Sequence, residues 1–340
     1  MNLYLTQDRI GTPTGGGAVT FHEYTALAGM GRPTNPIDNA RIPLTLNPFE
    51  NDRLIADFVA RMTMSEPVEL AHIYSGCFTE TVRVLKKRGA KVCYTAAAHS
   101  ITESRREFQE LGIEFDFPHL TDPVLWEKYV GGYRDADLVI CPSQISKACM
   151  ESYGCKNVIV IPHGCESRET IAPMPKEFTV GYLGQSGPDK GLRYLFEAWA
   201  RLGLKDATLL LAGNNIPLGM QLWRNHGGSR IHFMGFVKDV SEFYDRISVY
   251  VQPSATEGFG IEVLEAMAHG RPVICSDGVG AVDVLNEHGL ADWAFKSRDV
   301  AGLMKLISKR PTNGAACRQI ARGYTWDSVR ERYQRAWGAL

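Results

Sequence analysis

Short apolar runs alternate with helical patterns along almost the whole of the 340-residue chain. In the first half, four β-prone runs predict strands at Leu3–Leu5, Glu69–Tyr74, Lys91–Thr95 and Leu138–Cys141. Five stretches with apolar residues at helical spacing predict helices at Val19–Ala28, Arg53–Met62, Phe78–Arg88, Ser104–Leu111 and Ser146–Tyr153. The segment from Gly31 to Asp52 carries four prolines and predicts no element.

The second half continues the same alternation. Its predicted strands are Val158–Ile161, Thr179–Leu183, Thr208–Ala212, Ile231–Met234, Val249–Val251 and Val273–Cys275. Its predicted helices include Leu192–Leu202, Val240–Asp245, Ile261–His269 and Val300–Ser308. Strands that alternate with helices are typical of parallel sheets with helices on both faces, and the length fits two such sheets. We therefore predict an α/β protein of two domains.

A proline-rich stretch separates the two predicted sheets. Residues 161–175 contain Pro162, Pro173 and Pro175 between two apolar runs, which is typical of a linker, so the first domain is expected to cover residues 1–165. Ligands of such domains bind at the carboxyl ends of the strands, and a cleft between two domains is a common place for a small-molecule site.

Composition and charge narrow the class of protein. The chain is 44% apolar and 22% charged, which excludes disordered and collagen-like classes. Its 37 basic and 38 acidic residues give a net charge of −1, with −3 on residues 1–165 and +2 on the rest, so nucleic acid is not favoured as a partner.

The cysteines and the apolar runs indicate the compartment. None of the eight cysteines forms a Cys-x-x-Cys pair, and several lie in apolar runs, so we expect buried free thiols rather than disulfides or a zinc site. The first residues do not resemble a signal peptide, and no apolar run approaches the roughly 20 residues that span a bilayer. The expectation is a soluble, cytoplasmic protein with no integral membrane segment.

Two glutamates eight residues apart, Glu257 and Glu265, lie in the most informative stretch, Pro253–Gly270. It predicts a buried strand, a turn containing glycine and a helix. The turn places Phe259, Gly260 and Ile261 at a helix N-terminus, where backbone N–H groups and the helix dipole favour an anion such as phosphate. Carboxylates beside an anion site suit a nucleotide-sugar, although either glutamate alone could equally be a solvated helix residue.

A second glycine-rich turn follows the predicted strand Thr179–Leu183. It runs from Gly184 and Gln185 to Lys190 and precedes the helix that begins near Leu192. Backbone donors together with a lysine at a helix N-terminus suit a diphosphate, although the spacing is not that of a Walker motif. An exposed lysine in a βα loop is the alternative.

Three more places are candidates for binding. Gly15, Gly16 and Gly17 follow the first strand and would let the backbone approach a phosphate or sugar, unless they form only a mobile turn. His99 follows the strand that ends at Thr95, where a structural histidine is an equal alternative. Leu209–Asn215 and Phe233–Asp239 are two more strand-to-loop junctions, and the second could present backbone groups to a base.

One apparent metal motif is rejected. Asp135-Ala-Asp137 has the Asp-x-Asp form of metal-dependent sugar transferases, but it leads directly into the apolar strand Leu138–Cys141 and has no acidic residue nearby. The basic run Lys86-Lys87-Arg88 is expected to end a helix, where cations complement the helix dipole.

The order of these motifs resembles that of the family 4 retaining glycosyltransferases of GT-B fold. The residues that carry the resemblance are, in order, Val160–Gly164, Gly184 with Lys190-Gly191, Leu211–Gly213, Gly235–Val237 and Pro253–Val273. The resemblance is dense from Val158 to Leu285 and weak from Gly31 to Asp52. It implies two Rossmann-like domains facing each other across a cleft, with residues 166–325 as the second. The terminal helix, about residues 326–340, would pack back onto the first.

The resemblance also implies roles for single residues. Lys190 would hold the donor diphosphate, Glu265 the ribose hydroxyls, and Glu257 would face the donor sugar, with the N–H groups of Phe259, Gly260 and Ile261 around its phosphate. The base would meet the loop of Gly235, Phe236 and Val237, the diphosphate would meet Gly16 and Gly17, and the transferred sugar would lie near His99.

The implied chemistry needs no metal and no cofactor other than the nucleoside-diphosphate-sugar that acts as co-substrate, because cations and helix termini stabilise the leaving diphosphate. UDP-sugars and GDP-sugars are both candidate donors. The acceptor, whether a small molecule, glycan, lipid or polymer, is not identified.

One position departs from the family pattern. The family usually has an arginine where this chain has Gln185, directly after the glycine that ends the strand. The loss of one cation would weaken stabilisation of the leaving group. Either another arginine or lysine substitutes from elsewhere, or the chain is a catalytically weak or silent subunit that binds nucleotide-sugar as a partner. A nucleotide-sugar epimerase on the same fold is a separate alternative.

Overall fold

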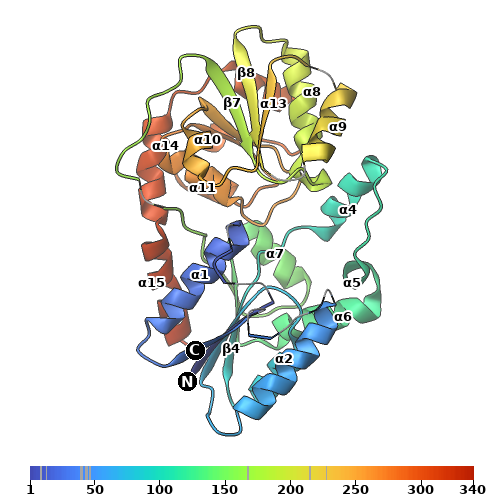
Figure 1. Ribbon diagram of the computed structural model, residues 1–340, viewed down its shortest axis with the longest axis vertical. Coiled ribbons are helices and arrows are strands. Elements are labelled where there is room, and N and C mark those ends of the chain that lie inside the picture. The colour runs from blue at the N-terminus through green and yellow to red at the C-terminus, as the bar shows by residue number, and fades with distance from the viewer. Residues whose placement is uncertain are drawn as a thin grey trace. The chain divides into compact units, whose positions relative to one another are not determined.

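The computed structural model describes residues 1–7, 10–12, 14–38, 41–42, 45, 47–166, 168–213, 216–226 and 228–340. The chain divides into two compact units (Figure 1). The first consists of Met1–Ala98, Asp116–His163 and Trp326–Leu340, and the second of His99–Phe115 and Gly164–Thr325. The expected first domain ran without interruption to residue 165, whereas residues 99–115 belong to the second unit.

The first unit is built on a parallel six-stranded sheet of order β2-β1-β3-β4-β5-β6. Its strands are β1 (Asn2–Thr6), β2 (Thr34–Ile37), β3 (Leu70–Tyr74), β4 (Lys91–Thr95), β5 (Leu138–Cys141) and β6 (Val158–Val160). Its helices are α1 (Gly15–Ala28), α2 (Pro48–Met62), α3 (Thr79–Lys87), α5 (Pro118–Thr121), α6 (Pro123–Asp135), α7 (Gln144–Ser152) and α15 (Trp326–Gly338).

Helices from both ends of the chain meet in this unit. The terminal helix α15 lies along α1 (Figure 1). On the other side, Ile55 and Val59 of α2 and Val82 and Leu85 of α3 share one buried cluster with Leu5 of β1. These apolar positions are three or four residues apart, as one face of a helix requires.

The second unit has a parallel six-stranded sheet of order β12-β11-β10-β7-β8-β9. Its strands are β7 (Phe178–Leu183), β8 (Ala207–Ala212), β9 (Ile231–Gly235), β10 (Val249–Gln252), β11 (Val273–Ser276) and β12 (Ala294–Phe295). Its helices are α4 (Ile101–Glu110), α8 (Leu192–Leu202), α9 (Ile216–His226), α10 (Val240–Tyr244), α11 (Ile261–Ala268), α12 (Val282–Glu287), α13 (Val300–Ser308) and α14 (Gly314–Ala321), with the short 3₁₀ turns η1 (Pro188–Lys190), η2 (Ala291–Trp293) and η3 (Arg322–Tyr324).

Alternate side chains along the strands of this sheet pack into two different hydrophobic clusters, one on each face. Leu209 and Leu211 of β8 pack with α8 and α13, whereas Leu210 and Ala212 pack in the cluster that contains α10, α11 and α14. The two sets of helices lie on opposite sides of β7 and β8 (Figure 1). Because both faces are covered, the strands are apolar throughout, which is why they could be predicted as continuous runs.

All ten predicted strands are present, with ends within about two residues of those expected, so the predicted α/β class with parallel sheets is confirmed. Among the described residues, two strands were missed. Strand β2 contains Pro36 and lies at the edge of its sheet, where proline is tolerated, and β12 has only two residues. Helix α1 begins at Gly15, four residues earlier than predicted.

The eight cysteines are free, and all are buried except the half-buried Cys149. No helix in the described ranges is long and apolar enough to cross a membrane. Parts of two segments lie outside the described residues. They are residues 39, 40, 43, 44 and 46 of the proline-rich segment, and Asn214 and Asn215 of the junction after β8.

Candidate functional site

The second sheet reverses its strand order between β7 and β10. From β7 the chain moves to β8 and β9 on one side and then returns to β10, β11 and β12 on the other. Ligands of open parallel sheets bind at the carboxyl ends of the strands beside such a reversal. The loop after β7 carries Lys190 and the loop after β10 carries Glu257, and these two side chains form an ion pair.

Close packing of the two loops brings Lys190 and Glu257 together. The N–H of Ala255 donates to the carbonyl of Asp189 at 2.7 Å. Gly191 has a φ of 71°, and a Cβ at this position would lie 2.0 Å from the carbonyl oxygen of Pro253. Only glycine allows this approach, so the sequence Lys190-Gly191 is needed as a pair.

The charges of the pair stabilise each other. Burial by itself would lower the pKa of Lys190, but the charges of Glu257 and Asp189 outweigh burial and raise it above its usual value. Burial would raise the pKa of Glu257, but Lys190 holds it below its usual value. Both groups are therefore charged near neutral pH. Their side chains are 25% and 19% exposed, so solvent and ligands can reach them.

Helix α11 begins beside this ion pair, as predicted. Its N-cap is Gly260, with a φ of 86° and no side chain to cap the helix, and the helix starts at Ile261. The N–H groups in the first turn of a helix have no partner within the helix, so this terminus can receive an anion. Phe259 is buried, and its carbonyl accepts a hydrogen bond from the N–H of Ala281, which fixes the turn.

Glu265 lies one helical turn beyond Ile261. Its Oε2 accepts a hydrogen bond of 2.8 Å from the hydroxyl of Tyr244 on α10. Burial raises the pKa of Glu265, and this hydrogen bond partly opposes the rise. The carboxylate is thus held in place by a neutral hydroxyl donor, and the charge of Glu166 adds to the rise of its pKa.

Sequence reasoning did not single out Glu262, although it stands between the two glutamates of the motif. Burial and the charges of Glu257 and Glu265 raise its pKa to about 7. This glutamate is in the first turn of α11, where the helix dipole normally favours a negative charge. The sequence did offer a signal, because Glu262 is a third carboxyl in the nine residues from Glu257 to Glu265. Its raised pKa implies that the charge of the site changes near neutral pH.

His99 lies in the second unit, just before α4. Its Nε2 is 3.8 Å from Oδ2 of Asp189, and its side chain is 40% exposed. The charge of His99 also helps to lower the pKa of Glu257. The structure thus brings His99 together with Lys190 and Glu257, and Asp189 joins them as a residue that the sequence did not indicate.

Gln185 occupies the place where the related family usually has arginine. The residue is exposed, and its backbone carbonyl accepts a hydrogen bond of 2.5 Å from the hydroxyl of Tyr182. This contact involves only the main chain, so it does not explain why the side chain is glutamine.

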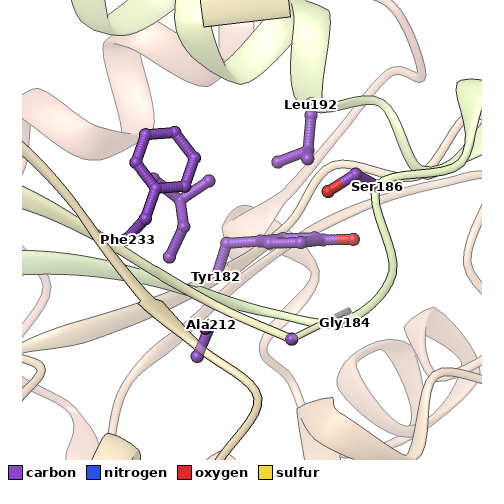
Figure 2. A pocket seen from close by; sticks show the side chains of 9 residues that line it. Tyr182, Gly184, Ser186, Leu192, Ala212 and Phe233 are labelled. Atoms are coloured by element: carbon purple, nitrogen blue, oxygen red, sulfur yellow. The ribbon is translucent and has the colours of Figure 1, made fainter. Parts of the chain in front are cut away.

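A small pocket lies beside the carboxyl ends of β7, β8 and β9 (Figure 2). Figure 2 shows the Tyr182 ring with its hydroxyl directed toward the loop of Gly184 and Ser186, while Phe233 lines the other side. Gly235, from the predicted base-binding loop, also lines the pocket. The next two residues differ in exposure, since the Phe236 side chain is 57% exposed and Val237 packs partly against the core.

Gly16 and Gly17 lie in the first unit, in the first turn of α1. The N–H of Gly17 donates to the hydroxyl of Thr14, the N-cap residue, at 3.0 Å. A Cβ on Gly17 would lie 2.0 Å from the Thr12 carbonyl oxygen, and one on Gly16 would lie 3.2 Å from the Tyr74 hydroxyl. Gly16 and Gly17 are therefore packed in the first turn of a helix.

Asp137 is used structurally, as the rejection of the metal motif implied. One carboxylate oxygen is 2.6 Å from Nζ of Lys86 at the end of α3, and the other accepts the N–H of Val92 at 2.8 Å. Among the described residues, no group of three or more histidine, cysteine or acidic side chains has a geometry that could hold a metal ion.

Comparison with known proteins agrees with the geometry. Residues 177–310 match the family described as "Glycosyl transferases group 1", and this range includes Lys190, Glu257 and Glu265. An uncharacterized glycosyltransferase from Methanocaldococcus jannaschii is 28% identical over 178 residues, which cover 48% of this chain and 45% of that protein. The chain spans about half the length of the curated relatives it matches.

Solved structures extend the similarity of fold to the whole chain. Sucrose-phosphate synthase from Thermosynechococcus elongatus matches with a TM-score of 0.74 and 20% identity, covering 100% of both chains. HepE from Anabaena, solved in complex with UDP, matches with a TM-score of 0.73 and 17% identity, again over 100% of both chains. The predicted GT-B fold and the resemblance to family 4 are thereby confirmed.

Proposed function

We propose that this chain, a family 4-like glycosyltransferase of GT-B fold with its group 1 domain at residues 177–310, transfers a sugar from a nucleoside-diphosphate-sugar to an acceptor with retention of configuration. The observation that carries the proposal is the Lys190–Glu257 ion pair at the strand reversal of the second sheet, next to the N-terminus of α11. A diphosphate needs a cation and N–H donors, and a sugar needs carboxylate acceptors, and this edge of the sheet offers both.

The donor diphosphate would bind between Lys190 and the first turn of α11. Lys190 supplies a positive charge, and the N–H groups of Phe259, Gly260 and Ile261 surround the phosphate nearest the sugar. In the second unit as it stands, Lys190 is paired with Glu257. The bound diphosphate would share the lysine, which leaves the carboxylate of Glu257 able to accept hydroxyl groups of the sugar.

Other residues would bind the ribose and the base of the nucleotide. Glu265, held by Tyr244, would accept the ribose hydroxyls. The base would meet backbone groups of Gly235, Phe236 and Val237, beside the pocket of Figure 2. By the same proposal, backbone groups of Gly16 and Gly17 at the N-terminus of α1 would contact the diphosphate.

The reaction itself would be helped mainly by charge. As the bond from the sugar to the diphosphate breaks, negative charge grows on the diphosphate, and Lys190 with the helix terminus stabilises it without a metal ion. The acceptor attacks the same face of an oxocarbenium-like centre, so configuration is retained. His99, beside Asp189 and Lys190, would lie near the transferred sugar.

Gln185 makes the proposed enzyme slower than relatives with arginine there. One charge-assisted contact to the diphosphate is worth about 1.5–3 kcal/mol, so Gln185→Arg is expected to accelerate turnover roughly 10- to 150-fold. A silent nucleotide-sugar-binding subunit and an epimerase are not favoured, since the matched family and relatives are transferases.

Incubation with radiolabelled UDP-, GDP- and ADP-sugars tests the proposed function. A transferase hydrolyses its donor slowly in the absence of acceptor, an epimerase interconverts the sugars, and a silent subunit binds one nucleotide-sugar without turnover. Repeating the assay in EDTA tests metal independence, and the configuration of the released sugar, followed by NMR, tests retention.

Titration calorimetry of the nucleoside diphosphate tests the site. Lys190→Ala and Glu265→Ala are each expected to weaken binding at least about tenfold, whereas Lys205→Ala, which removes an exposed lysine from the same unit, leaves it unchanged. Unchanged binding in both site variants would show that the nucleotide binds elsewhere.

A further inference from the structure

Helix α4 packs on the second unit, although β4 before it and α5 after it both belong to the first. The chain leaves the first unit at Ala98, forms α4 against η1, and returns at Asp116. A ten-residue helix that crosses to another unit and back requires specific contacts that hold it there.

The start of α4 forms hydrogen bonds with the residues that directly precede Glu257 and Lys190, the two members of the ion pair. The N–H of Ser100 donates to the hydroxyl of Thr256 at 3.1 Å, and Thr256 precedes Glu257. The hydroxyl of Ser104 lies 3.4 Å from Oδ2 of Asp189, which precedes Lys190. His99 stands next to Ser100 and approaches the same Asp189 oxygen. The position of α4 therefore sets where His99 lies relative to the ion pair.

Further along α4, a fully buried glutamate fixes the helix. Glu107 is 0% exposed; its Oε2 forms an ion pair with Arg193 at 3.0 Å, and its Oε1 accepts a hydrogen bond from Arg298 at 2.7 Å. The hydroxyl of Tyr194 lies 3.1 Å from both oxygens. Burial and the charge of Glu107 raise the pKa of Tyr194 to about 12, so its hydroxyl keeps the proton that it donates.

Two features indicate that these contacts are maintained at a cost. A buried carboxylate with two arginines is expensive to desolvate, and apolar residues could hold a helix equally well. Arg298 also has a φ of 70°, a left-handed conformation that costs a residue with a Cβ about 1–2 kcal/mol. Strained residues of this kind gather where geometry matters for function. Ion pairs and hydrogen bonds depend on direction, whereas apolar packing does not. The contacts of Glu107 therefore fix the orientation of α4 as well as its position.

We propose that Glu107, clamped by Arg193, Arg298 and Tyr194, is a positioning residue that holds α4 on the second unit so that His99 stands beside the Lys190–Glu257 pair. This inference rests on the proposed function, because His99 is taken to act near the transferred sugar. Glu107 itself touches no substrate. Its contribution is to turnover through His99 rather than to nucleotide binding.

Glu107→Gln tests the proposal, since glutamine keeps the shape but loses the charge and one acceptor oxygen. Turnover of the donor is expected to fall roughly 10- to 100-fold, as small displacements of catalytic groups do, while the Kd of the nucleoside diphosphate stays within about twofold. The matched control is Glu110→Gln, which removes a charge from the same helix and another partner of Arg193 at an exposed position. This control is expected to keep kcat within about twofold.

A double-mutant cycle with His99→Ala separates positioning from simple loss of structure. If Glu107 acts through His99, Glu107→Gln causes no further loss of kcat in the His99→Ala background. A loss of the same size in both backgrounds would overturn the proposal. Arg298→Lys, which retains a cation facing Glu107, is expected to retain more activity than Arg298→Met.

Hydrogen exchange of the α4 amides supplies a readout that needs no activity. Exchange over residues 101–110 is expected to quicken in Glu107→Gln and to stay slow in Glu110→Gln. Faster exchange with unchanged kcat would overturn the positioning role even though the clamp exists. If the wild-type protein turns over no nucleotide-sugar, the proposed function fails, and unchanged exchange in Glu107→Gln would separately refute the clamp.

Discussion

The two sheets of this protein have the same kind of topology but different chemistry where their strand order reverses. In the first sheet the reversal lies between β1 and β3, and in the second between β7 and β10. In the first, the side-chain amide of Gln7 donates to the carbonyl of Cys77 at 2.8 Å and bridges the two loops. In the second, an ion pair, Lys190 with Glu257, occupies the corresponding edge. A shared topology provides two edges, and the side chains decide what each can bind.

Each unit also secures one helix from a distant part of the chain with a buried glutamate. In the first unit, Glu23 lies 3.1 Å from Nε2 of His72, and Trp337 of α15 donates to the other ring nitrogen at 3.1 Å. In the second, Glu107 of α4 meets two arginines. The first arrangement places the aromatic side chains of His72 and Tyr4 against its glutamate, while the second places two arginines there. We expect the first to govern stability and the second to govern geometry at the site.

The largest expected effect comes from breaking the first arrangement. Burial would raise the pKa of Glu23, but His72, Thr95 and Tyr4 hold it below its usual value, so the buried carboxylate is charged. His72→Leu would deprive it of its main partner, and the free energy of unfolding of the first unit should fall by about 3–5 kcal/mol. Hydrogen exchange in urea measures this for β3 and α15, with β10 of the second unit unaffected.

Gln334→Ala is the matched control for this change. Its side chain also joins α15 to the first unit, donating to the carbonyl of Ala26 at 2.9 Å, but it carries no charge. The expected loss is about 1 kcal/mol. Equal losses in Gln334→Ala and His72→Leu would mean that the buried glutamate has no special part in holding α15.

The next largest effect concerns the contact between the two loops of the second sheet. Gly191→Ala places a Cβ 2.0 Å from the Pro253 carbonyl at a left-handed position, so the loops must move apart. Strain and displacement together are expected to weaken nucleotide binding by roughly 10- to 100-fold. Titration calorimetry measures the change.

Gly203→Ala separates strain from displacement. Gly203, at the other end of α8, has a φ of 56° and nothing within 4 Å of its missing Cβ. Its substitution costs about 1 kcal/mol of stability and leaves binding unchanged. If Gly203→Ala weakened binding as much as Gly191→Ala, the spacing of the loops would not matter.

The sequence predicted the strand, turn and helix around the ion pair better than it predicted the contacts of α4. Glu257 and Glu265 lie within one strand, turn and helix, so local spacing was enough to predict where they stand. Glu107 lies in a strongly charged run that indicates an exposed helix face. Its partners Arg193 and Arg298 are far away in sequence, so no local sequence pattern could predict these contacts. The same limit hid the assignment of residues 99–115 to the second unit.

A similar contrast holds within the fold. Continuous apolar runs identified the buried strands, because both faces of each sheet are covered. Strand β2 was not predicted because it contains Pro36. Proline is compatible with a strand at the edge of a sheet, and the sequence did not show that β2 lies at an edge. The first turn of α1 was missed because three glycines predict a turn, whereas Gly16 and Gly17 are selected here by packing against Tyr74 and Thr12.

A smaller effect is expected from Glu262, whose pKa is raised to about 7. Above this pH a third negative charge stands beside Glu257 and Glu265, so diphosphate affinity should fall as pH rises from 6 to 8. In Glu262→Gln the affinity should stay level, which at pH 8 makes it roughly 3- to 10-fold higher than in wild type. Glu242→Gln, at an exposed position on α10, should keep the wild-type profile.

The same carboxyl affects stability in the same direction. A pKa raised from 4.5 in the unfolded chain to about 7 gives a contribution that is complete below pH 4.5 and lost as pH rises through 7. Glu262→Gln should therefore raise the Tm by a few degrees at pH 8 and by much less at pH 5. A Tm difference that grows toward acid pH would contradict this sign.

The smallest effect should come from Tyr244→Phe, which removes one hydrogen bond to Glu265. If Glu265 binds ribose, nucleoside diphosphate affinity falls about 2- to 10-fold, while binding of pyrophosphate is unchanged. Because the Tyr244 hydroxyl lowers the pKa of Glu265 against the effect of burial, its loss raises that pKa further, so the defect should deepen as the pH is lowered. Tyr324→Phe, which removes a similar bond to Glu287, is the control. Equal weakening of nucleotide and pyrophosphate would assign Glu265 to the diphosphate instead of the ribose.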